Sequence, residues 1–360
     1  MFPRFTSYNG QFALLFTIFA FASTAHGVFA FSSRAAPSVV CVGETLYDSL
    51  PEALFLGGAV TNVAVHLSSL GVNAAVASCV GNDQLGKEAR RRLETRNVDT
   101  SLMQLHDDLG TGMVIATLDE RGDASYEFDT PAAWDGLKLS NELEDAVSSA
   151  SVVVIGTIAC RLGSSECATS AATISTICNT AKEDSVVMDI NLRPPWYEAS
   201  DVLALCRGDA DDAAELAMLK LNEEELPIVE SWCGLQSSND GLFGDAIQQR
   251  MKALGSAVNA KRVCVTRGDS GAALYCRQGD VFVENGGYSC ESQPGSDTVG
   301  AGDSFLAALI RYLLLEKEPA DQALERACAL GAYVANVRGA VPSHDAAPEK
   351  LRQIFSKQIL

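Results

Sequence analysis

Basic side chains are scarce in this chain. Its 360 residues include 27 Lys and Arg against 46 Asp and Glu, which gives a formal net charge of −19. Proteins that bind nucleic acid need a positive surface to meet the phosphate backbone, so this balance argues against such a partner. It leaves open an enzyme with an anionic substrate, provided that backbone N–H groups and a few cations line its site.

Histidine and cysteine do not occur at the spacings that are typical of metal sites and disulfide frameworks. The four histidines (His26, His66, His106 and His344) have no ligand-like spacing, and His66 is expected on a helix surface or in the core. The 11 cysteines are scattered singly, their number is odd, and none forms a Cys-x-x-Cys pair. This usage is typical of reduced thiols that pack as small hydrophobic side chains.

The first 36 residues differ from the rest. Arg4 precedes the apolar stretch Phe12–Phe21, which is too short to span a membrane and has the order of a signal sequence. Residues 31–37 are rich in Ser, Arg and Ala and free of acids, like a transit peptide. We interpret residues 1–36 as a presequence resembling the bipartite presequence of algae with secondary plastids. A plain secretory signal is the alternative; the unpaired cysteines favour the plastid stroma.

From residue 37 onward, strands are expected to alternate with helices. The expected strands include 38–42, 74–80, 151–155, 185–190, 218–221 and 262–266, and the expected helices include 59–70, 84–96 and 170–182. Strands that are apolar throughout and are spaced by helices predict an α/β fold around a mainly parallel sheet. We expect one domain over 37–345 and a C-terminal helix over 346–360.

Two segments break this alternation. Residues 45–56 and 111–130 contain strands in which apolar and polar residues alternate. Such alternation is typical of an antiparallel sheet with one solvated face. We expect the two segments to form a small β-sheet lid on the main domain.

The run Ser296–Phe305, followed by the apolar segment Leu306–Ile310, is the most informative in the chain. Small residues stand at 300–302, where the chain must turn tightly, and Asp303 closes the turn where a helix is expected to begin. Free N–H groups and the positive dipole end of a helix start can hold an anion. A carboxylate there could take a proton from a hydroxyl that attacks a phosphate. An ordinary loop with an acidic helix start is the alternative.

Further polar residues are expected at the carboxyl ends of strands or at helix starts, the edge where open α/β sheets bind ligands. Each of them, taken alone, also fits a structural role: a solvated acid, a permissive turn, a surface ion pair or an acid that stabilises a helix start. These residues are Asp48, Gly57, Gly58, Asn62, Asn191, Arg193, Asn222, Glu225, Thr266 and Gly268.

Together these motifs resemble the signatures of the PfkB/ribokinase family of sugar kinases, over roughly residues 38–345. Asp297–Phe305 reads Asp-Thr-x-Gly-Ala-Gly-Asp-Ser-Phe, which is similar to the second family signature. Residues 57–64 read Gly-Gly-x-x-x-Asn-x-Ala, similar to the first, and Asp189–Arg193 matches Asp-x-Asn-x-Arg of the sugar-kinase branch. The resemblance implies a ribokinase-like, Rossmann-type three-layer sandwich with a β lid.

The resemblance also implies roles for residues. Asp303 would be the catalytic base, and the N–H groups of Gly300, Ala301 and Gly302 would stabilise charge on the transferring phosphate. Arg193 would point at the substrate and the phosphate. The implied sugar ligands are Asp48, Gly57, Gly58, Asn62, Asn191 and Arg193.

The cofactors implied are ATP and Mg²⁺, with K⁺ as a further candidate. Asn222 and Glu225 match Asn-x-x-Glu, which would organise Mg²⁺ through water. Thr266 and Gly268 resemble a nucleotide contact, to which Gly300 and Gly302 would add. Oxygens for a monovalent cation would come from Asp297, Val299, Gly339 and Ser343.

We therefore interpret the chain as an ATP-dependent kinase for a primary hydroxyl of a sugar. Ala59 after the paired glycines and the stretch Pro131–Asp135 look most like fructokinases, and a 2-keto-3-deoxygluconate kinase is the nearest enzymatic alternative. A fructokinase-like plastid scaffold and a sugar sensor without turnover are the alternatives from other classes; intact Gly300, Gly302 and Asp303 favour an enzyme. The expected partners are small molecules, with neither nucleic acid nor a membrane, and the resemblance implies a homodimer through the lid.

Overall fold

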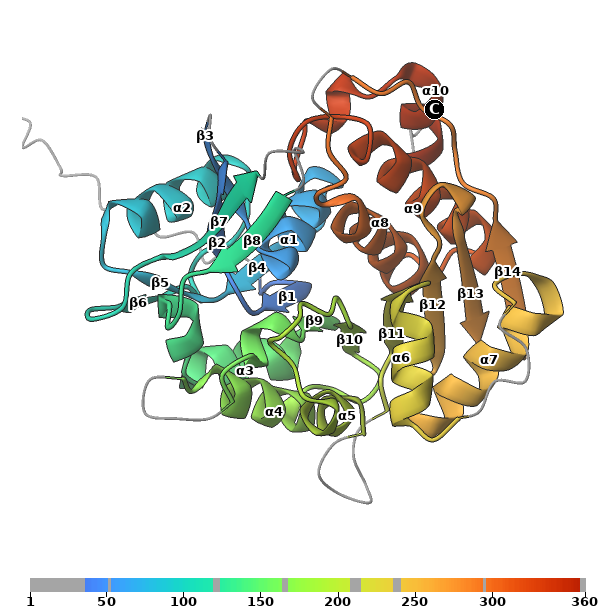
Figure 1. Ribbon diagram of the computed structural model, residues 1–360, viewed down its shortest axis with the longest axis horizontal. Helices are drawn as coiled ribbons and strands as arrows, with labels where there is room; N and C mark the ends of the chain where they lie inside the picture. Colours follow the sequence, from blue (N-terminus) through green and yellow to red (C-terminus); the bar gives the residue numbers. More distant parts are fainter. Residues whose placement is uncertain are drawn as a thin grey trace, which may run out of the picture. The chain divides into compact units, whose positions relative to one another are not determined.

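An eight-stranded sheet forms the centre of the fold (Figure 1). The computed structural model describes residues 36–50, 53–118, 124–163, 168–207, 215–235, 241–293 and 296–356, so the interpretation of 1–36 as a presequence lies outside it except for Ala36. The strands follow the order β14-β13-β12-β11-β10-β9-β1-β4, parallel from β12 to β4, with β13 and β14 antiparallel. Their bounds are β1 Val39–Val42, β4 Ala74–Ala77, β9 Val152–Gly156, β10 Val186–Asp189, β11 Met218–Asn222, β12 Arg262–Thr266, β13 Ala272–Cys276 and β14 Val281–Asn285.

Helices cover both faces of this sheet, as the uniformly apolar strands predict. Neighbouring strand residues point to opposite faces, so Val39 belongs to one buried cluster and Val40 to the other. One face packs against α1 (Ala59–Ser69), α8 (Ala301–Leu309), α9 (Ala320–Val334) and α10 (Glu349–Phe355). The other packs against α3 (Asn141–Ser149), α4 (Ser170–Thr180), α5 (Ala199–Arg207), α6 (Glu225–Trp232) and α7 (Gly244–Ala257). The predicted three-layer architecture is confirmed.

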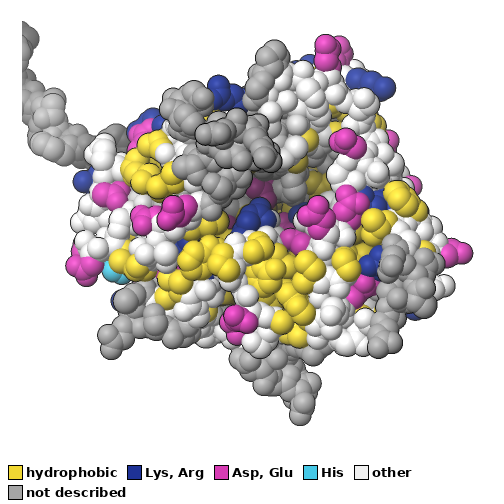
Figure 2. Space-filling model, viewed as in Figure 1, with side chains coloured by type: hydrophobic (Ala, Val, Ile, Leu, Met, Phe, Trp, Pro, Cys, Tyr) yellow, Lys and Arg dark blue, Asp and Glu magenta, His cyan; other side chains and the backbone are white. Residues whose placement is uncertain are grey.

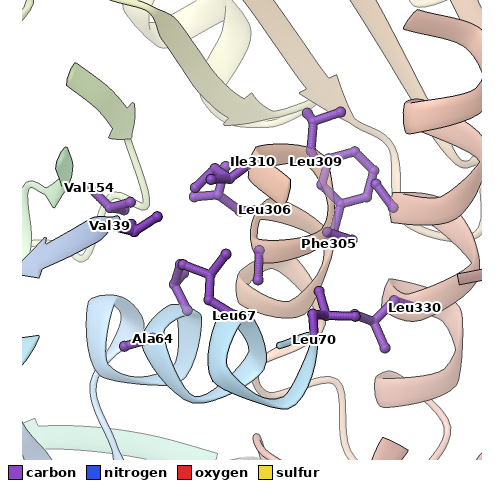
Figure 3. Packing of buried hydrophobic residues seen from close by; sticks show 14 of the residues in the cluster. Val39, Ala64, Leu67, Leu70, Val154, Phe305, Leu306, Leu309, Ile310 and Leu330 are labelled. Carbon is purple, nitrogen blue, oxygen red and sulfur yellow. The ribbon is translucent and has the colours of Figure 1, made fainter. Parts of the chain in front are cut away.

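The contact between α1 and α8 lies at the centre of the first cluster. Figure 3 shows Leu67 of α1 beside Leu306 of α8, with Val39 of β1 close to both. Both leucine side chains are fully buried. A turn of π-helix, Ile310–Leu315, continues α8 and is also buried against this cluster. Because both helices begin at the carboxyl-end edge of the sheet, their packing sets the distance between their first turns.

A smaller sheet contains the strands that the structure describes in both segments expected in the lid, whose residues 51–52 and 119–123 lie outside the described part of the chain. Its order is β3-β2-β7-β8, with bounds β2 Leu46–Leu50, β3 Ala53–Gly57, β7 Gly112–Leu118 and β8 Ala124–Phe128. The two hairpins are antiparallel, but β2 and β7 pair in parallel, so the expectation of a fully antiparallel sheet is wrong. The two hairpins are far apart in sequence, so no tight turn fixes the relative direction of β2 and β7.

The prediction of a single strand over 74–80 is also wrong. It breaks at Ser78 into β4 and β5 (Cys79–Gly81), and β5 pairs with β6 (Gln104–His106) in a separate sheet. The carbonyl of Ser78 accepts a hydrogen bond from the N–H of Gln104, which directs the chain toward its new partner. The remaining elements are α2 (Gln84–Thr95) and the 3-10 turns Ala133–Gly136, Ile158–Cys160, Gly268–Ser270 and His344–Ala346.

The described helices include none with the length and apolar character needed to cross a membrane. The ten cysteines within the described residues are all free thiols.

Candidate active site

The start of helix α8 forms the centre of the candidate site. Gly300 adopts a left-handed backbone (φ 77°), and a Cβ there would overlap the carbonyl of Ala340. The N–H of Ala301 donates to the carbonyl of Thr298 at 3.3 Å. The N–H groups of Gly302 and Asp303 make no hydrogen bond within the described residues, so these two donors can meet an anion.

Asp303 lies in the first turn of α8 and is only 9% exposed. The Asn62 amide donates a hydrogen bond of 2.8 Å to its Oδ2. Burial, together with the nearby charge of Asp189, raises the pKa of Asp303 to about 6. The hydrogen bond from Asn62 and the charges of Lys220 and Arg193 act in the opposite direction and lower this pKa. The result is a carboxylate that is ionised at neutral pH but more basic than an exposed one.

Asn62 reaches Asp303 because of the way helix α1 begins. Gly58 has φ 106°, and a Cβ there would overlap the carbonyl of Glu44. The Glu44 carboxylate accepts the N–H of Ala59 at 2.7 Å and so closes the helix start. Its other oxygen, Oε2, is buried without a partner within the described residues, and burial raises the pKa of Glu44 to about 7. Sequence reasoning did not identify Glu44, although an acid at the end of a buried strand was a signal.

Asp48 comes from β2 of the small sheet. A Cβ on Gly57 would overlap Asp48 Oδ2, so one of the paired glycines leaves space for this carboxylate. Burial raises the pKa of Asp48 to about 6, with Asp297 adding to the effect and Arg193 opposing it. The structure therefore brings Asp48 within electrostatic reach of the loop before α8.

A buried ion pair lies beneath the helix start. Lys220 Nζ contacts both carboxylate oxygens of Asp189, at 2.9 and 2.8 Å. A Cβ on Gly302 would lie 3.3 Å from the same nitrogen. Burial alone would lower the pKa of Lys220, but Asp189 outweighs it and holds the pKa above its usual value. Sequence reasoning missed Lys220; a lysine inside an apolar strand was the available signal.

Asn191 and Arg193 follow β10, as predicted. Asn191 has a left-handed backbone (φ 41°), and Arg193 is exposed, with Nη1 donating to the carbonyl of Leu192 at 2.9 Å. The Arg193 charge lowers the pKa values of Glu44, Asp48 and Asp303. One cation thus acts on three carboxyl groups that come from three separate elements.

Asn222 and Glu225 lie together at the end of β11. Glu225 is buried and accepts the N–H of Leu192 at 2.7 Å and that of Asn222 at 2.9 Å. Asn222 Oδ1 accepts the N–H groups of Glu224 and Glu225. These contacts join the ends of β10 and β11, and they leave the Asn222 side-chain amide for other partners.

Two further predicted positions lie beside this pair. Thr266 is the register partner of Asn222, and its carbonyl accepts the N–H of Glu223 at 2.9 Å. Gly268 follows with φ 50°. The predicted nucleotide positions therefore share one edge with Asn222.

Asp297 links two loops. Its Oδ1 accepts the N–H of Val299, and its Oδ2 accepts the N–H of Gly339, both at 3.1 Å. The carbonyl of Ser343 instead accepts the hydroxyl of Tyr333 at 2.8 Å. Three of the four positions predicted for a monovalent cation are thus joined by hydrogen bonds, and Ser343 is held separately.

No cluster of three or more His, Cys, Asp or Glu side chains suited to a metal ion occurs in the part of the chain that the structure describes. Figure 2 shows a hollow near the middle of the face of the molecule that it draws, and acidic and basic side chains gather there. A divalent ion there would take its ligands mainly from water and phosphate, as Mg²⁺ commonly does.

Comparisons with known proteins identify the family. The model of the pfkB family of carbohydrate kinases matches residues 38–347. A fructokinase of Salmonella typhimurium is 30% identical over 311 residues, covering 83% of this chain and 94% of its own. The probable fructokinase-6, chloroplastic, of Arabidopsis thaliana is 29% identical over 334 residues, covering 87% and 81%.

Solved structures share the fold. The fructokinase of Xylella fastidiosa with bound ATP superposes with a TM-score of 0.69 at 20% identity, covering 89% of this chain and 98% of its own. The Arabidopsis thaliana ribokinase complexed with ribose and ATP gives a TM-score of 0.66 at 21% identity, covering 89% and 99%. The ribokinase-like fold is confirmed, and the chain belongs to the pfkB family of carbohydrate kinases, which are phosphotransferases.

Proposed function

We propose that this protein transfers the γ-phosphate of ATP to a primary hydroxyl of a sugar, with fructose as the preferred acceptor. The observation that carries the proposal is the placement of Asp303, held by Asn62 at 2.8 Å beside the free N–H groups of the α8 start. Its pKa of about 6 suits a general base at neutral pH. The relatives named fructokinase and the neighbour with bound ATP support the two substrates.

In the proposed reaction, Asp303 takes the proton of the sugar hydroxyl as its oxygen attacks the γ-phosphorus. The new P–O bond forms while the bond to the ADP oxygen breaks, and ADP carries away the leaving-group charge. Of the N–H groups predicted to stabilise charge on the transferring phosphoryl group, that of Gly302 is free to do so, and the N–H of Asp303 adds to it. The predicted N–H of Ala301 instead donates to the carbonyl of Thr298. Arg193 stabilises the same charge from the β10 side.

The sugar would lie between the small sheet and the helix starts. Asp48, at the edge of the site, would accept hydrogen bonds from sugar hydroxyls, and Asn62 and Asn191 can both donate and accept them. Gly57 and Gly58 allow the backbone to approach the sugar, besides giving space to Asp48 and Glu44. Closure of the lid would exclude water and so limit ATP hydrolysis.

The residues at the strand ends fit Mg²⁺ bound through water. Mg²⁺ neutralises phosphate charge when it is bound with the nucleotide. Asn222 has its side-chain amide available, while Glu225 has both oxygens engaged by N–H groups and would act through water and by fixing Asn222. Thr266, Gly268, Gly300 and Gly302 would contact the nucleotide. Oxygen donors at Asp297, Val299, Gly339 and Ser343 suit a hard monovalent cation such as K⁺.

The proposed location is the plastid stroma. A relative named as chloroplastic and the composition of residues 1–36 support it. A fusion of residues 1–45 to a fluorescent reporter should accumulate in plastids, and a secreted reporter would instead identify a secretory signal.

An ADP-release assay on the chain from Ala36 tests the activity. Fructose is expected to give the fastest turnover among fructose, ribose, 2-keto-3-deoxygluconate, glucose and adenosine. Asp303→Asn should lower kcat on the order of 10²–10⁴-fold, the range for loss of a general base. Asp321→Asn, which changes an exposed acid in the first turn of α9, is the matched control. Wild-type protein that folds and turns over no sugar would instead support the scaffold or sensor alternatives.

The pH dependence of kcat/KM tests the role of Asp303. Only the ionised base accepts a proton, so kcat/KM should rise with pH through about 6 and level off above it. Glu44→Gln and Asp48→Asn are the controls, because Glu44 and Asp48 titrate nearby, with pKa values of about 7 and 6. A rise centred near 4, or one that disappears in either control variant, would show that another group controls the rate.

Asp303→Asn should also stabilise the fold. A folded-state pKa of about 6, above the ordinary value of 3.8, means that the buried negative charge destabilises the native state at high pH. Its removal should raise the free energy of unfolding by on the order of 2–3 kcal/mol at pH 8. The gain should shrink as the pH falls from 6 to 4, where the wild-type carboxyl is neutral. Urea unfolding at both pH values measures it, and a variant less stable than wild type at pH 8 contradicts it.

A further inference from the structure

Arg161 carries a charged side chain into the interior of the protein. It follows the 3-10 turn Ile158–Cys160, just beyond the carboxyl end of β9, and its side chain is fully buried. Its guanidinium binds the equally buried carboxylate of Asp135 through Nε at 3.2 Å and Nη2 at 2.8 Å. The third nitrogen, Nη1, is buried without a partner within the described residues. A hydrophobic side chain would fill this space without the cost of burying an incompletely paired charge, so packing alone does not account for Arg161.

The first element that Arg161 holds is the end of strand β8 in the small sheet. Its Nη2 also donates to the carbonyl of Asp129 at 2.7 Å, and its guanidinium carbon lies 5.4 Å from the centre of the Phe128 ring. Asp129 in turn donates its N–H to the carbonyl of Met113 on β7 at 2.9 Å. A side chain from the edge of the main sheet is therefore joined to the hairpin formed by β7 and β8.

The same guanidinium packs on the 3-10 turn Ala133–Gly136, which follows this hairpin. It lies over the Trp134 ring, 4.0 Å from the ring centre. The N–H of Ala133 donates to the carbonyl of Gly110, just before β7, at 2.8 Å. The turn thus connects Arg161 to the beginning of the hairpin as well as to its end.

The second element that Arg161 holds is the loop after β10, which carries Arg193. The Trp196 ring of this loop has its centre 5.3 Å from the Arg161 guanidinium carbon, a distance at which a cation and an aromatic ring attract each other. The N–H of Trp196 donates to the carbonyl of Arg193 at 2.9 Å, so this ring and the backbone of Arg193 belong to one turn. One buried cation therefore contacts both the small sheet and the Arg193 loop.

We propose that Arg161 is a positioning residue that holds the β7–β8 hairpin and the Arg193 loop in fixed places at the edge of the main sheet. Its effect on the reaction rests on the proposed function, in which the small sheet covers the sugar and Arg193 meets the phosphate. Arg161 acts through these two segments and not on the substrate itself. Without it, both segments would keep their fold but would be less restrained.

The variant Arg161→Met/Asp135→Asn tests this role. Met keeps an apolar stem of similar length, and Asn keeps an acceptor for the N–H of Ala132, which Asp135 Oδ2 accepts at 2.8 Å. Removing both charges avoids an unpaired buried carboxylate, which would itself destabilise the fold. Arg250→Met/Glu230→Gln is the matched control, because Arg250 of α7 and Glu230 of α6 form another buried pair with two hydrogen bonds.

Steady-state kinetics with fructose separate positioning from folding. Arg161→Met/Asp135→Asn should raise KM for the sugar and lower kcat, so that kcat/KM falls at least about tenfold, because small displacements around the reacting groups cost large factors in rate. A variant that is only partly folded has a lower apparent kcat, since less enzyme is active, but the same KM. The control variant should therefore keep the wild-type KM. A wild-type KM in Arg161→Met/Asp135→Asn would overturn the proposal.

Hydrogen exchange of backbone amides, measured by mass spectrometry without substrates, tests the same role independently of activity. Peptides covering 124–136 and 190–198 should exchange at least about threefold faster in Arg161→Met/Asp135→Asn than in the wild type, and not in the control variant. Unchanged exchange in either segment would overturn the proposal, as would faster exchange throughout the main sheet, which would indicate general destabilisation. A wild type that phosphorylates no sugar, with the expected local change in exchange, would refute the proposed function and leave the restraint by Arg161 standing.

Discussion

The packing of α1 against α8 is the constraint on which the site depends. Leu67 and Leu306 are buried in one cluster, and this contact lets Asn62 donate to Asp303 across 241 positions of sequence. A hydrogen bond of 2.8 Å between side chains on two helices requires that neither helix shift by much. Since protein interiors are close-packed, the apolar contacts between the two helices fix the position of the hydrogen bond from Asn62 to Asp303. The catalytic geometry is therefore a consequence of the core.

Several buried carboxyl groups lie close together in the site, and the nearby cations neutralise only part of their negative charge. Glu44, Asp48 and Asp303 all have pKa values raised by burial, to about 7, 6 and 6. Arg193 lowers all three, and Lys220, already bound to Asp189, lowers that of Asp303 further. Arg193 and Lys220 lower the pKa of Asp303 without forming a direct ion pair with it. A direct ion pair would lower the pKa further and make Asp303 a weaker base. The buried negative charge that these cations do not neutralise lowers the stability of the fold at the site where the proposed reaction requires a basic carboxylate.

Motifs local in sequence could be predicted, and pairings between distant segments could not. The α8 start, the α1 start and the positions of most strands along the chain follow from glycines, apolar runs and their spacing. The parallel pairing of β2 with β7 and the break at Ser78 depend on partners far along the chain. Glu44 and Lys220 were not predicted because their sequence signals, an acid at the end of a buried strand and a lysine inside an apolar strand, do not show which groups the side chains contact. His66 and His344, 2.9 Å apart between ring nitrogens, show the same limit.

The loop 338–343 connects several parts of the site. Asp297 accepts the N–H of Gly339, Ala340 packs against Gly300, and the carbonyl of Val341 accepts from Arg96. The ring of His66, on the same helix as Asn62, is bonded to the carbonyl of Ala340, and burial holds its pKa near 3, so this bond persists at neutral pH. The turn beneath Asp303 is thus supported by one loop with contacts to α1, α2 and Asp297. A group that binds any one of these partners changes the support of the others, which makes this loop the physical route by which a neighbouring cation could alter the base.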